Sequence, residues 1–270
     1  MAGNALWMGS LAVAGGHAVS YLRSMKILVV VLGLAFASAD LTAAQSTPAA
    51  RDSIALDHLR NDWASLARYQ PANAQLAQPA AGEERVVFYG NSITDSWAQY
   101  FPSMFPGKPY VGRGISGQTT PQMLLRFQQD VVSLHPAAVL ILAGTNDIAE
   151  NTGPCTDTQI QDNFKSMVQI SAQNHIRVIL ASMPPADRFP WRPDIKPAAR
   201  IRTLNAWMKA YADKQHLVYL DYYTAMATPQ GAMRPELALD QVVHPNDAGY
   251  AIMQPLAEAA IAKSLATPAP

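Results

Sequence analysis

The sequence has one cysteine in 270 residues, Cys155, so it contains no pair that could form a disulfide within the chain. Charged residues are also few, at 15% of the chain, and the 20 lysines and arginines equal the 20 aspartates and glutamates. Nucleic-acid binding and acidic tails both need a concentration of charge of one sign, which this balance does not provide. We therefore expect neither a disulfide-stapled scaffold nor a nucleic-acid partner.

The spacings by which proteins commonly bind metals are absent as well. The chain has six histidines, but neither a His-Glu-x-x-His nor a Cys-x-x-Cys pattern occurs in it. Cys155 comes at the end of a loop-like stretch with glycine and proline, which favours a bystander over a nucleophile. We expect no metal and no cofactor.

No apolar run near the N-terminus reaches the length of an ordinary membrane span. Two basic residues, Arg23 and Lys26, precede the apolar run Ile27–Ala37, and small residues then offer cleavage sites after Ala39 or Ala44. This order is typical of a secretory signal. It predicts a bacterial protein of the periplasm or the exterior, with no stable membrane span after processing. An uncleaved membrane anchor is the alternative.

The chain is accordingly expected to consist of an extension and signal over residues 1–44 and one domain over residues 45–270. In that domain, short apolar runs alternate with longer amphipathic segments. Strands are predicted near 85–89, 109–112, 138–143, 177–182 and 217–221, and helices near 120–133, 158–174, 197–214 and 247–265. Such alternation predicts an α/β fold, a three-layer sandwich in which helices flank a central parallel sheet.

One further helix is expected ahead of the first strand, at about 52–69. Leu56, Leu59, Trp63 and Leu66 recur there at helical spacing. We expect the apolar face of this helix to pack against the domain.

A serine follows the first predicted strand at a turn. The segment Arg85–Tyr89 is short, β-branched and aromatic, and Gly90 closes it two residues before Ser92. A serine at such a strand end, with a helix after it, lies near backbone N–H groups that favour developing negative charge. Ser92 is therefore a candidate nucleophile, although a helix-capping role would explain the same local sequence.

Three further blocks follow Ser92 in the chain and supply complementary chemistry. Gly117 and Asn146 come after the second and third predicted strands, and His244 stands near the C-terminus. Acyl transfer needs a hydroxyl, a base that takes its proton, and donors aimed at the oxyanion. Because active groups of parallel sheets gather at the carboxyl ends of the strands, we expect these residues to converge.

The four blocks resemble those of the SGNH hydrolases, also called the GDSL esterase and lipase family. The resemblance runs from about Asp62 to the C-terminal helix and implies the flavodoxin-like fold of that family. By this resemblance, Ser92 is the nucleophile, Gly117 and Asn146 are oxyanion donors, and His244 is the general base. It implies a serine esterase that hydrolyses carboxylic esters through an acyl-enzyme.

The sequence departs from the family pattern in two places. Asn91 precedes the serine where the family usually has aspartate, and we place Asn91 among the residues that contact the substrate. The family's orienting aspartate stands three residues before the histidine, where this chain has Gln241, and Asp240 stands four before. Either Asp240 still reaches His244 through a loop with one extra residue, or another acceptor holds the imidazole. We favour Asp240.

The expected substrate is a small-molecule or carbohydrate ester with a short acyl group such as acetyl, although the family also cleaves other esters. Phe189 and Trp191 lie in a proline-rich loop and are predicted either to wall the substrate site or only to anchor that loop. A catalytically weakened carbohydrate- or lipid-binding protein of the same fold is the alternative function, motivated by the two departures.

Two other motifs compete with this interpretation. The stretch Gly112–Gly117 matches the dinucleotide-binding pattern G-x-G-x-x-G, but no acidic residue follows at the required distance. The α/β-hydrolase pattern G-x-S-x-G fails at Ser92, because Thr94 replaces its second glycine. Neither a nicotinamide cofactor nor that fold is expected.

Overall fold

The computed structural model describes residues 53, 56–57, 59–240 and 242–270. The chain divides into two compact units, Met1–Leu59 and Arg60–Pro270. The predicted signal of residues 1–44 lies outside the described residues, and so does Gln241.

A five-stranded parallel sheet forms the centre of this unit, with strand order β2-β1-β3-β4-β5. The strands are β1 (Val86–Gly90), β2 (Tyr110–Gly114), β3 (Ala138–Leu142), β4 (Arg177–Ala181) and β5 (Val218–Leu220). Gly90, the last residue of β1, pairs with the last residue of both neighbours, Gly114 of β2 and Leu142 of β3. The three strands that precede the predicted site residues therefore end at one level.

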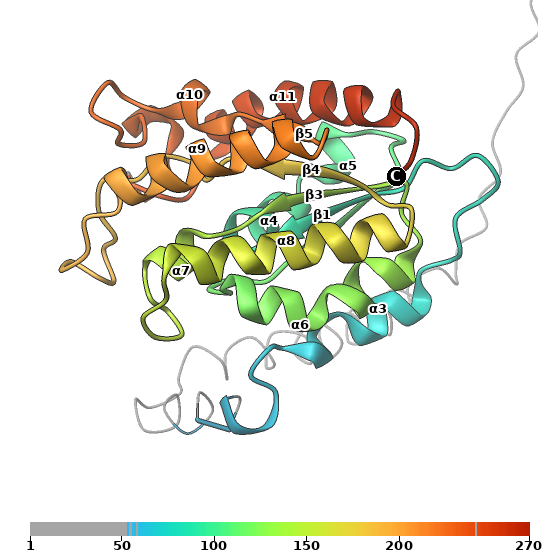
Figure 1. Ribbon diagram of the computed structural model, residues 1–270, viewed down its shortest axis with the longest axis horizontal. Coiled ribbons are helices and arrows are strands. Elements are labelled where there is room, and N and C mark those ends of the chain that lie inside the picture. Colours follow the sequence, from blue (N-terminus) through green and yellow to red (C-terminus); the bar gives the residue numbers. More distant parts are fainter. Residues whose placement is uncertain (1–52, 54–55, 58, 241) are drawn as a thin grey trace, which may run out of the picture. The chain divides into compact units, whose positions relative to one another are not determined.

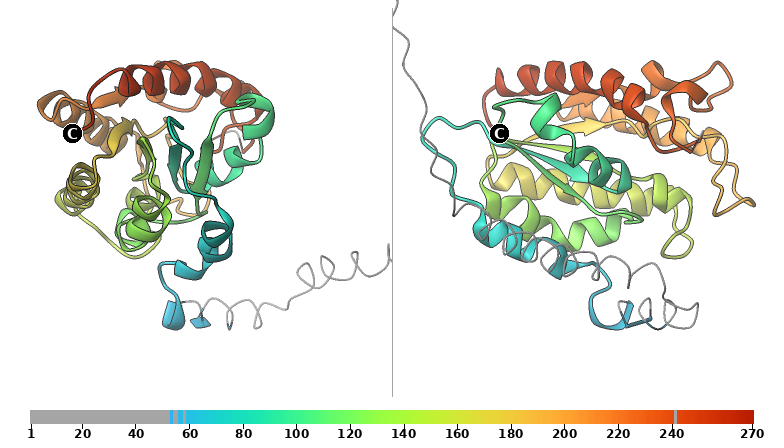
Figure 2. Two further views of the ribbon diagram at one scale, coloured as in Figure 1. Left: turned by 90° about the vertical axis from the view of Figure 1, so that its right-hand side faces the viewer. Right: turned by 180° about the vertical axis from the view of Figure 1, so that it is seen from behind.

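Helices cover both faces of the sheet, as Figures 1 and 2 show. The two faces can be told apart because neighbouring strand residues point to opposite sides. Val87 and Tyr89 pack in the apolar core with α6, α8 and α9, whereas Val86 and Phe88 pack with α4, α5, α10 and α11. The predicted α/β three-layer architecture is confirmed.

The described helices and 3₁₀ turns connect the strands in the expected alternation. The α-helices are α3 (Gln70–Gln75), α4 (Ser92–Ala98), α5 (Phe101–Met104), α6 (Thr120–Asp130), α7 (Thr145–Ile148), α8 (Asp157–Gln173), α9 (Ala198–Lys214), α10 (Tyr222–Met226) and α11 (Asp247–Leu265). Short 3₁₀ turns are η1 (Leu66–Tyr69), η2 (Val132–Leu134) and η3 (Pro235–Leu237). Among the residues that the structure describes, no helix is both long and apolar enough to cross a bilayer.

The prediction of a single helix over about 52–69 is wrong. Helical residues end at Asn61, and a separate 3₁₀ turn begins at Leu66. The carboxylate of Asp62 accepts hydrogen bonds from the backbone N–H groups of Leu66 (2.6 Å) and Ala67 (3.0 Å), and Ser65 adopts a left-handed φ of 54°. Local side-chain acceptors of this kind compete with the helical ladder, which the apolar periodicity alone did not reveal.

Candidate active site

Ser92 is the first residue of α4 and stands two residues after the end of β1. Asn91 is the N-cap of α4 and accepts a hydrogen bond from the Ile93 N–H at 3.3 Å, so Ser92 becomes the first helical residue. The chain can turn this tightly because Gly90 has no side chain. A Cβ at Gly90 would collide with the Thr94 side chain and would lie 2.8 Å from the carbonyl oxygen of Leu142.

The Ser92 hydroxyl lies beside the imidazole of His244, 152 residues further along the chain. Ser92 Oγ is 3.0 Å from His244 Nε2, and His244 Nδ1 is 2.7 Å from Asp240 Oδ2. An ionised carboxylate can only accept, so Nδ1 carries the hydrogen of a neutral imidazole, and Nε2 is left as the acceptor for the serine proton. The three side chains thus form one hydrogen-bonded chain, in which Ser92 donates to His244 and His244 donates to Asp240.

Asp240 reaches the imidazole because the backbone folds around its other oxygen. Asp240 Oδ1 accepts from the N–H groups of Val242 (3.0 Å), Val243 (2.7 Å) and His244 (3.1 Å). Partial burial raises the pKa of Asp240, but these backbone bonds and the one to His244 outweigh it, and the pKa is lower than usual. The compact turn brings a carboxylate four residues before the histidine within hydrogen-bonding distance of its ring.

Gly117 lies in the loop after β2 and Asn146 in α7, the short helix after β3, so both follow strands that end at the same level of the sheet. The Gln118 N–H bonds to the Ile115 carbonyl oxygen at 3.3 Å, which closes a turn with Gly117 at its third position and a φ of +79°. Such turns require glycine there.

Asn146 is buried, and its Nδ2 donates to the Gln118 carbonyl oxygen at 2.9 Å. An amide nitrogen carries two hydrogens, so this bond orients Asn146 and leaves a second donor direction.

Asp147, next to Asn146, was not singled out from the sequence. Its buried carboxylate accepts from the Thr120 N–H, at 2.9 Å to Oδ1 and 3.0 Å to Oδ2, and from the Thr120 hydroxyl at 2.5 Å. These bonds join α7, which carries Asn146, to the start of α6. Burial raises the pKa of Asp147 to about 6, although the bonds from Thr120 oppose the shift.

Arg126, which the sequence did not reveal either, ties the strand ends together from within the core. Its fully buried guanidinium donates to the carbonyl oxygens of Gly90 (3.0 Å) and Arg113 (3.0 Å). Its Nε donates to the Gln118 side chain at 2.6 Å, and Asp130 balances its charge at 3.1 Å. A basic residue in an amphipathic helix ordinarily indicates a solvated face, so only the fold identifies this one as internal.

The two aromatic residues of the proline-rich loop have different positions. Trp191 is 41% exposed, and its ring centroid lies 6.2 Å from that of His244. Phe189 is 0% exposed and stacks behind Trp191 with ring centroids 5.2 Å apart, so its side chain supports the wall and does not itself face a ligand. Asn91 is buried as well, and its side-chain oxygen is engaged in the cap of α4.

A cavity of about 470 Å³ adjoins His244, between the end of α4 and the start of α11. Tyr100 lines it and donates to Asp247 at 3.0 Å, and Leu239, 77% exposed, lines it as well. No lysine or arginine is among its described lining residues.

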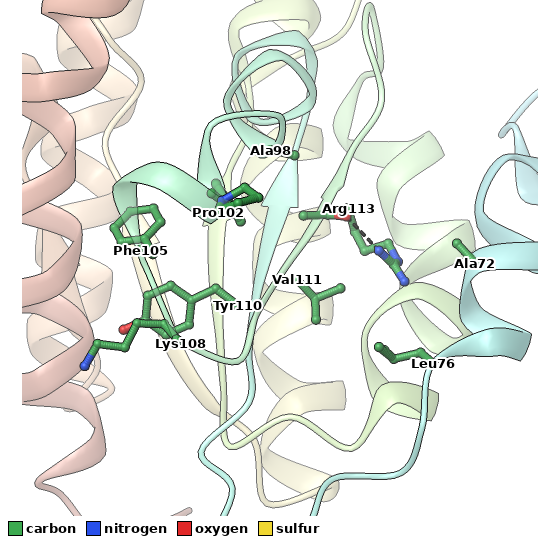
Figure 3. Close-up of a pocket in the computed structure, with 12 residues that line it drawn as sticks. Ala72, Leu76, Ala98, Pro102, Phe105, Lys108, Tyr110, Val111 and Arg113 are labelled. Atoms are coloured by element: carbon green, nitrogen blue, oxygen red, sulfur yellow. Dashed lines mark hydrogen bonds between the residues drawn. The ribbon is translucent and has the colours of Figure 1, made fainter. Parts of the chain in front are cut away.

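A second hollow of about 530 Å³ runs along the edge strand β2, with Arg113 toward Ala72 at one end of the view and Phe105 at the other (Figure 3). None of the predicted site residues lines this second hollow.

The described part of the chain contains no group of three or more His, Cys, Asp or Glu side chains placed to hold a metal ion. Cys155 is partly buried, and its thiol lies 3.5 Å from the carbonyl oxygen of Asp147.

Comparison of the sequence and the structure with known proteins identifies proteins that are similar to this chain. Residues 88–252 match the GDSL-like Lipase/Acylhydrolase family, whereas no curated protein matches the sequence. A solved structure of a protein proposed to be an acylhydrolase, from Bacteroides fragilis, is 46% identical, with a TM-score of 0.74 over 76% of this chain and 99% of that one. A GDSL-like lipase from Bacteroides thetaiotaomicron is also 46% identical, with a TM-score of 0.72 over 75% and 99% of the two chains.

More distant solved structures share the fold. An acetylxylan esterase from Geobacillus stearothermophilus is 18% identical, with a TM-score of 0.55 over 69% of this chain and 96% of that one. At this identity the likeness concerns the fold alone.

Proposed function

Because the chain belongs to the GDSL-like lipase and acylhydrolase family, we propose that it is a serine esterase that works through an acyl-enzyme on Ser92. The observation that carries the proposal is the hydrogen-bonded chain from Ser92 Oγ through His244 to Asp240, with distances of 3.0 and 2.7 Å. Serine hydrolases on unrelated folds use the same three roles in the same geometric order.

In the acylation step, Ser92 Oγ attacks the carbonyl carbon of the ester while its proton passes to His244 Nε2. The imidazolium that forms is stabilised by the carboxylate of Asp240, which also fixes the orientation of the ring. When the tetrahedral intermediate collapses, the bond between carbon and the alcohol oxygen breaks, and the leaving oxygen takes the proton from His244.

The charge that develops on the carbonyl oxygen is held by three donors in this proposal: the N–H groups of Ser92 and Gly117 and the side chain of Asn146. The bond from Asn146 to the Gln118 carbonyl supports its role, since it fixes the amide before any substrate arrives. Preorganised donors of this kind stabilise the transition state without reorganising during the reaction. Water then attacks the acyl-enzyme, with His244 again as the base, and releases the acid and the free Ser92 hydroxyl.

The proposed substrate is the ester of a short acyl group, such as acetyl, with a neutral alcohol or a carbohydrate. Trp191 stands close to His244 and restricts the space next to the reacting groups, which favours a short chain on that side. The cavity on the α4 side of His244 offers room for the alcohol, and its described lining lacks a cationic group that would select a phosphate. We further propose that the protein is exported, in line with the signal expected at its N-terminus.

Hydrolysis of p-nitrophenyl esters from acetate to palmitate tests this function. We expect turnover to be highest with acetate and to fall with chain length, and we expect the Ser92→Ala variant to be inactive with its melting temperature nearly unchanged. A wild-type protein that binds acetylated carbohydrate but turns over none of the esters would favour the non-catalytic binding protein.

A further inference from the structure

One side chain outside the proposed catalytic residues joins two parts of the site. Asn151 Nδ2 donates to the carbonyl oxygen of Gly117 at 3.1 Å, and Asn151 Oδ1 accepts from Trp191 Nε1 at 3.1 Å. The same amide thus bonds to the turn that presents one proposed oxyanion donor and to the aromatic wall beside His244. Its donor end serves the first contact and its acceptor end the second.

The segment that carries Asn151 is itself held in place. The Asn151 N–H bonds to the carbonyl oxygen of Asn146 at 3.0 Å, so it is tied to the other proposed oxyanion residue through the backbone. Arg192, the neighbour of Trp191, donates to the Ala149 carbonyl at 2.8 Å and pairs with Glu150 at 3.0 Å. Glu150 has a left-handed φ of 55°, a strained conformation that these contacts maintain.

The contact with Gly117 restrains the turn of residues 115–118, called the oxyanion turn here because it carries the Gly117 N–H. The peptide group between Gly117 and Gln118 is held at its N–H by the Ile115 carbonyl and at its oxygen by Asn151. The Gly117 N–H belongs to the preceding peptide group, between Ser116 and Gly117. Because glycine has the greatest backbone freedom of any residue, a restraint on the peptide group after it limits the directions that its own N–H can take. Without Asn151 the described contacts restrain this peptide group on one side only.

We propose that Asn151 is a positioning residue that fixes the oxyanion turn and the Trp191 side chain relative to each other. The inference rests on the proposed function, because it takes the Gly117 N–H as an oxyanion donor and Trp191 as a substrate contact. Through its donor end Asn151 acts on the chemical step, and through its acceptor end it acts on substrate binding. The two effects can be separated by mutation.

The test is a double-mutant cycle of wild type, Trp191→Phe, Asn151→Ala and the double variant, assayed with p-nitrophenyl acetate. In the Trp191→Phe background, Asn151 has lost its indole partner, and its removal deletes the Gly117 bond without adding a charge. We expect Asn151→Ala to lower kcat by about 3- to 10-fold in both backgrounds, the range for one ordinary hydrogen bond. We expect it to raise KM only where Trp191 is present.

Asn174→Ala is the matched control. Asn174 is also exposed and its side-chain amide also donates to a backbone carbonyl, that of Ile170 at 2.8 Å, but it lies at the end of α8. We expect this variant to match wild type in kcat and KM. Equal kcat for Asn151→Ala and Asn174→Ala would overturn the proposal, and so would a change confined to KM in the Trp191→Phe background. Loss of activity in Ser92→Ala tests the proposed function separately, so the two failures are distinguishable.

Discussion

Replacing Asp240 with asparagine separates its effect on catalysis from its effect on stability. The side-chain oxygen of the introduced asparagine can still accept the three backbone N–H groups that Asp240 Oδ1 accepts, so the turn should keep its shape. The amide nitrogen, however, would face His244 Nδ1 as a donor. The imidazole would then carry its hydrogen on Nε2, where it cannot take the proton of Ser92.

The expected cost follows from this change of tautomer. In serine triads the same substitution lowers kcat by about 10⁴, which corresponds to roughly 5 kcal/mol at about 1.36 kcal/mol per tenfold change. We expect Asp240→Asn to lower kcat by about 10³–10⁴ while the melting temperature stays within a few degrees of wild type. Asp240→Ala should lose the three backbone bonds as well, each worth about 1 kcal/mol, and should melt measurably lower.

The assay is the hydrolysis of p-nitrophenyl acetate, with melting followed by circular dichroism and Gln241→Ala as the control. Gln241 occupies the position at which the family usually has its acid, so it is the residue to exclude. If Gln241→Ala collapses kcat and Asp240→Asn leaves it within tenfold of wild type, the assignment of Asp240 is wrong. His244 would then be oriented by another acceptor.

Three further predictions test other parts of the account. Asn146→Ala should lower kcat by about 10²–10³, the scale for one oxyanion donor, with KM little changed, and a loss of affinity alone would assign Asn146 to binding. Folding raises the pKa of Asp147 from 3.8 to about 6, so the folded protein holds this proton more tightly than the unfolded chain does. The contribution of Asp147 to the free energy of unfolding is therefore most favourable below pH 3.8 and declines as the pH rises to about 6. Chemical denaturation between about pH 4 and 7 should therefore show Asp147→Asn gaining free energy of unfolding relative to wild type up to about pH 6, and a constant difference would refute the shift. A protein lacking residues 1–44 should fold and retain esterase activity, and mass spectrometry of the exported protein should find the N-terminus at or after Asp40.

The sequence predicted β1 and β3 well because both are short runs that are buried on both faces, whereas the edge strand β2 is only partly buried and carries a weaker apolar signal. Val139–Leu142 is such a run, and it forms most of β3. The convergence of Ser92, Gly117 and Asn146 could also be anticipated, since residues just beyond parallel strands share one edge of the sheet. The register that aligns Gly90 with Gly114 and Leu142 gives this expectation its physical basis.

What the sequence did not reveal depends on contacts between distant segments. Arg126 and Asp147 are polar residues whose burial follows from the packing of α6 against the sheet, and no local pattern marks them. Asn151 is exposed and bonds to partners 34 and 40 residues away. The burial of Phe189 behind Trp191 likewise depends on how the proline-rich loop folds back, which the order of residues does not determine.

The central claim is that Ser92 forms the acyl-enzyme, and covalent labelling tests it most directly. The protein is incubated with a fluorophosphonate, and its intact mass and its peptides are then measured. We predict a single adduct on Ser92 in the wild type, a much slower reaction in His244→Ala, and no adduct in Ser92→Ala, which is also inactive toward p-nitrophenyl acetate. An adduct on another residue, or full ester hydrolysis by Ser92→Ala, would contradict the account.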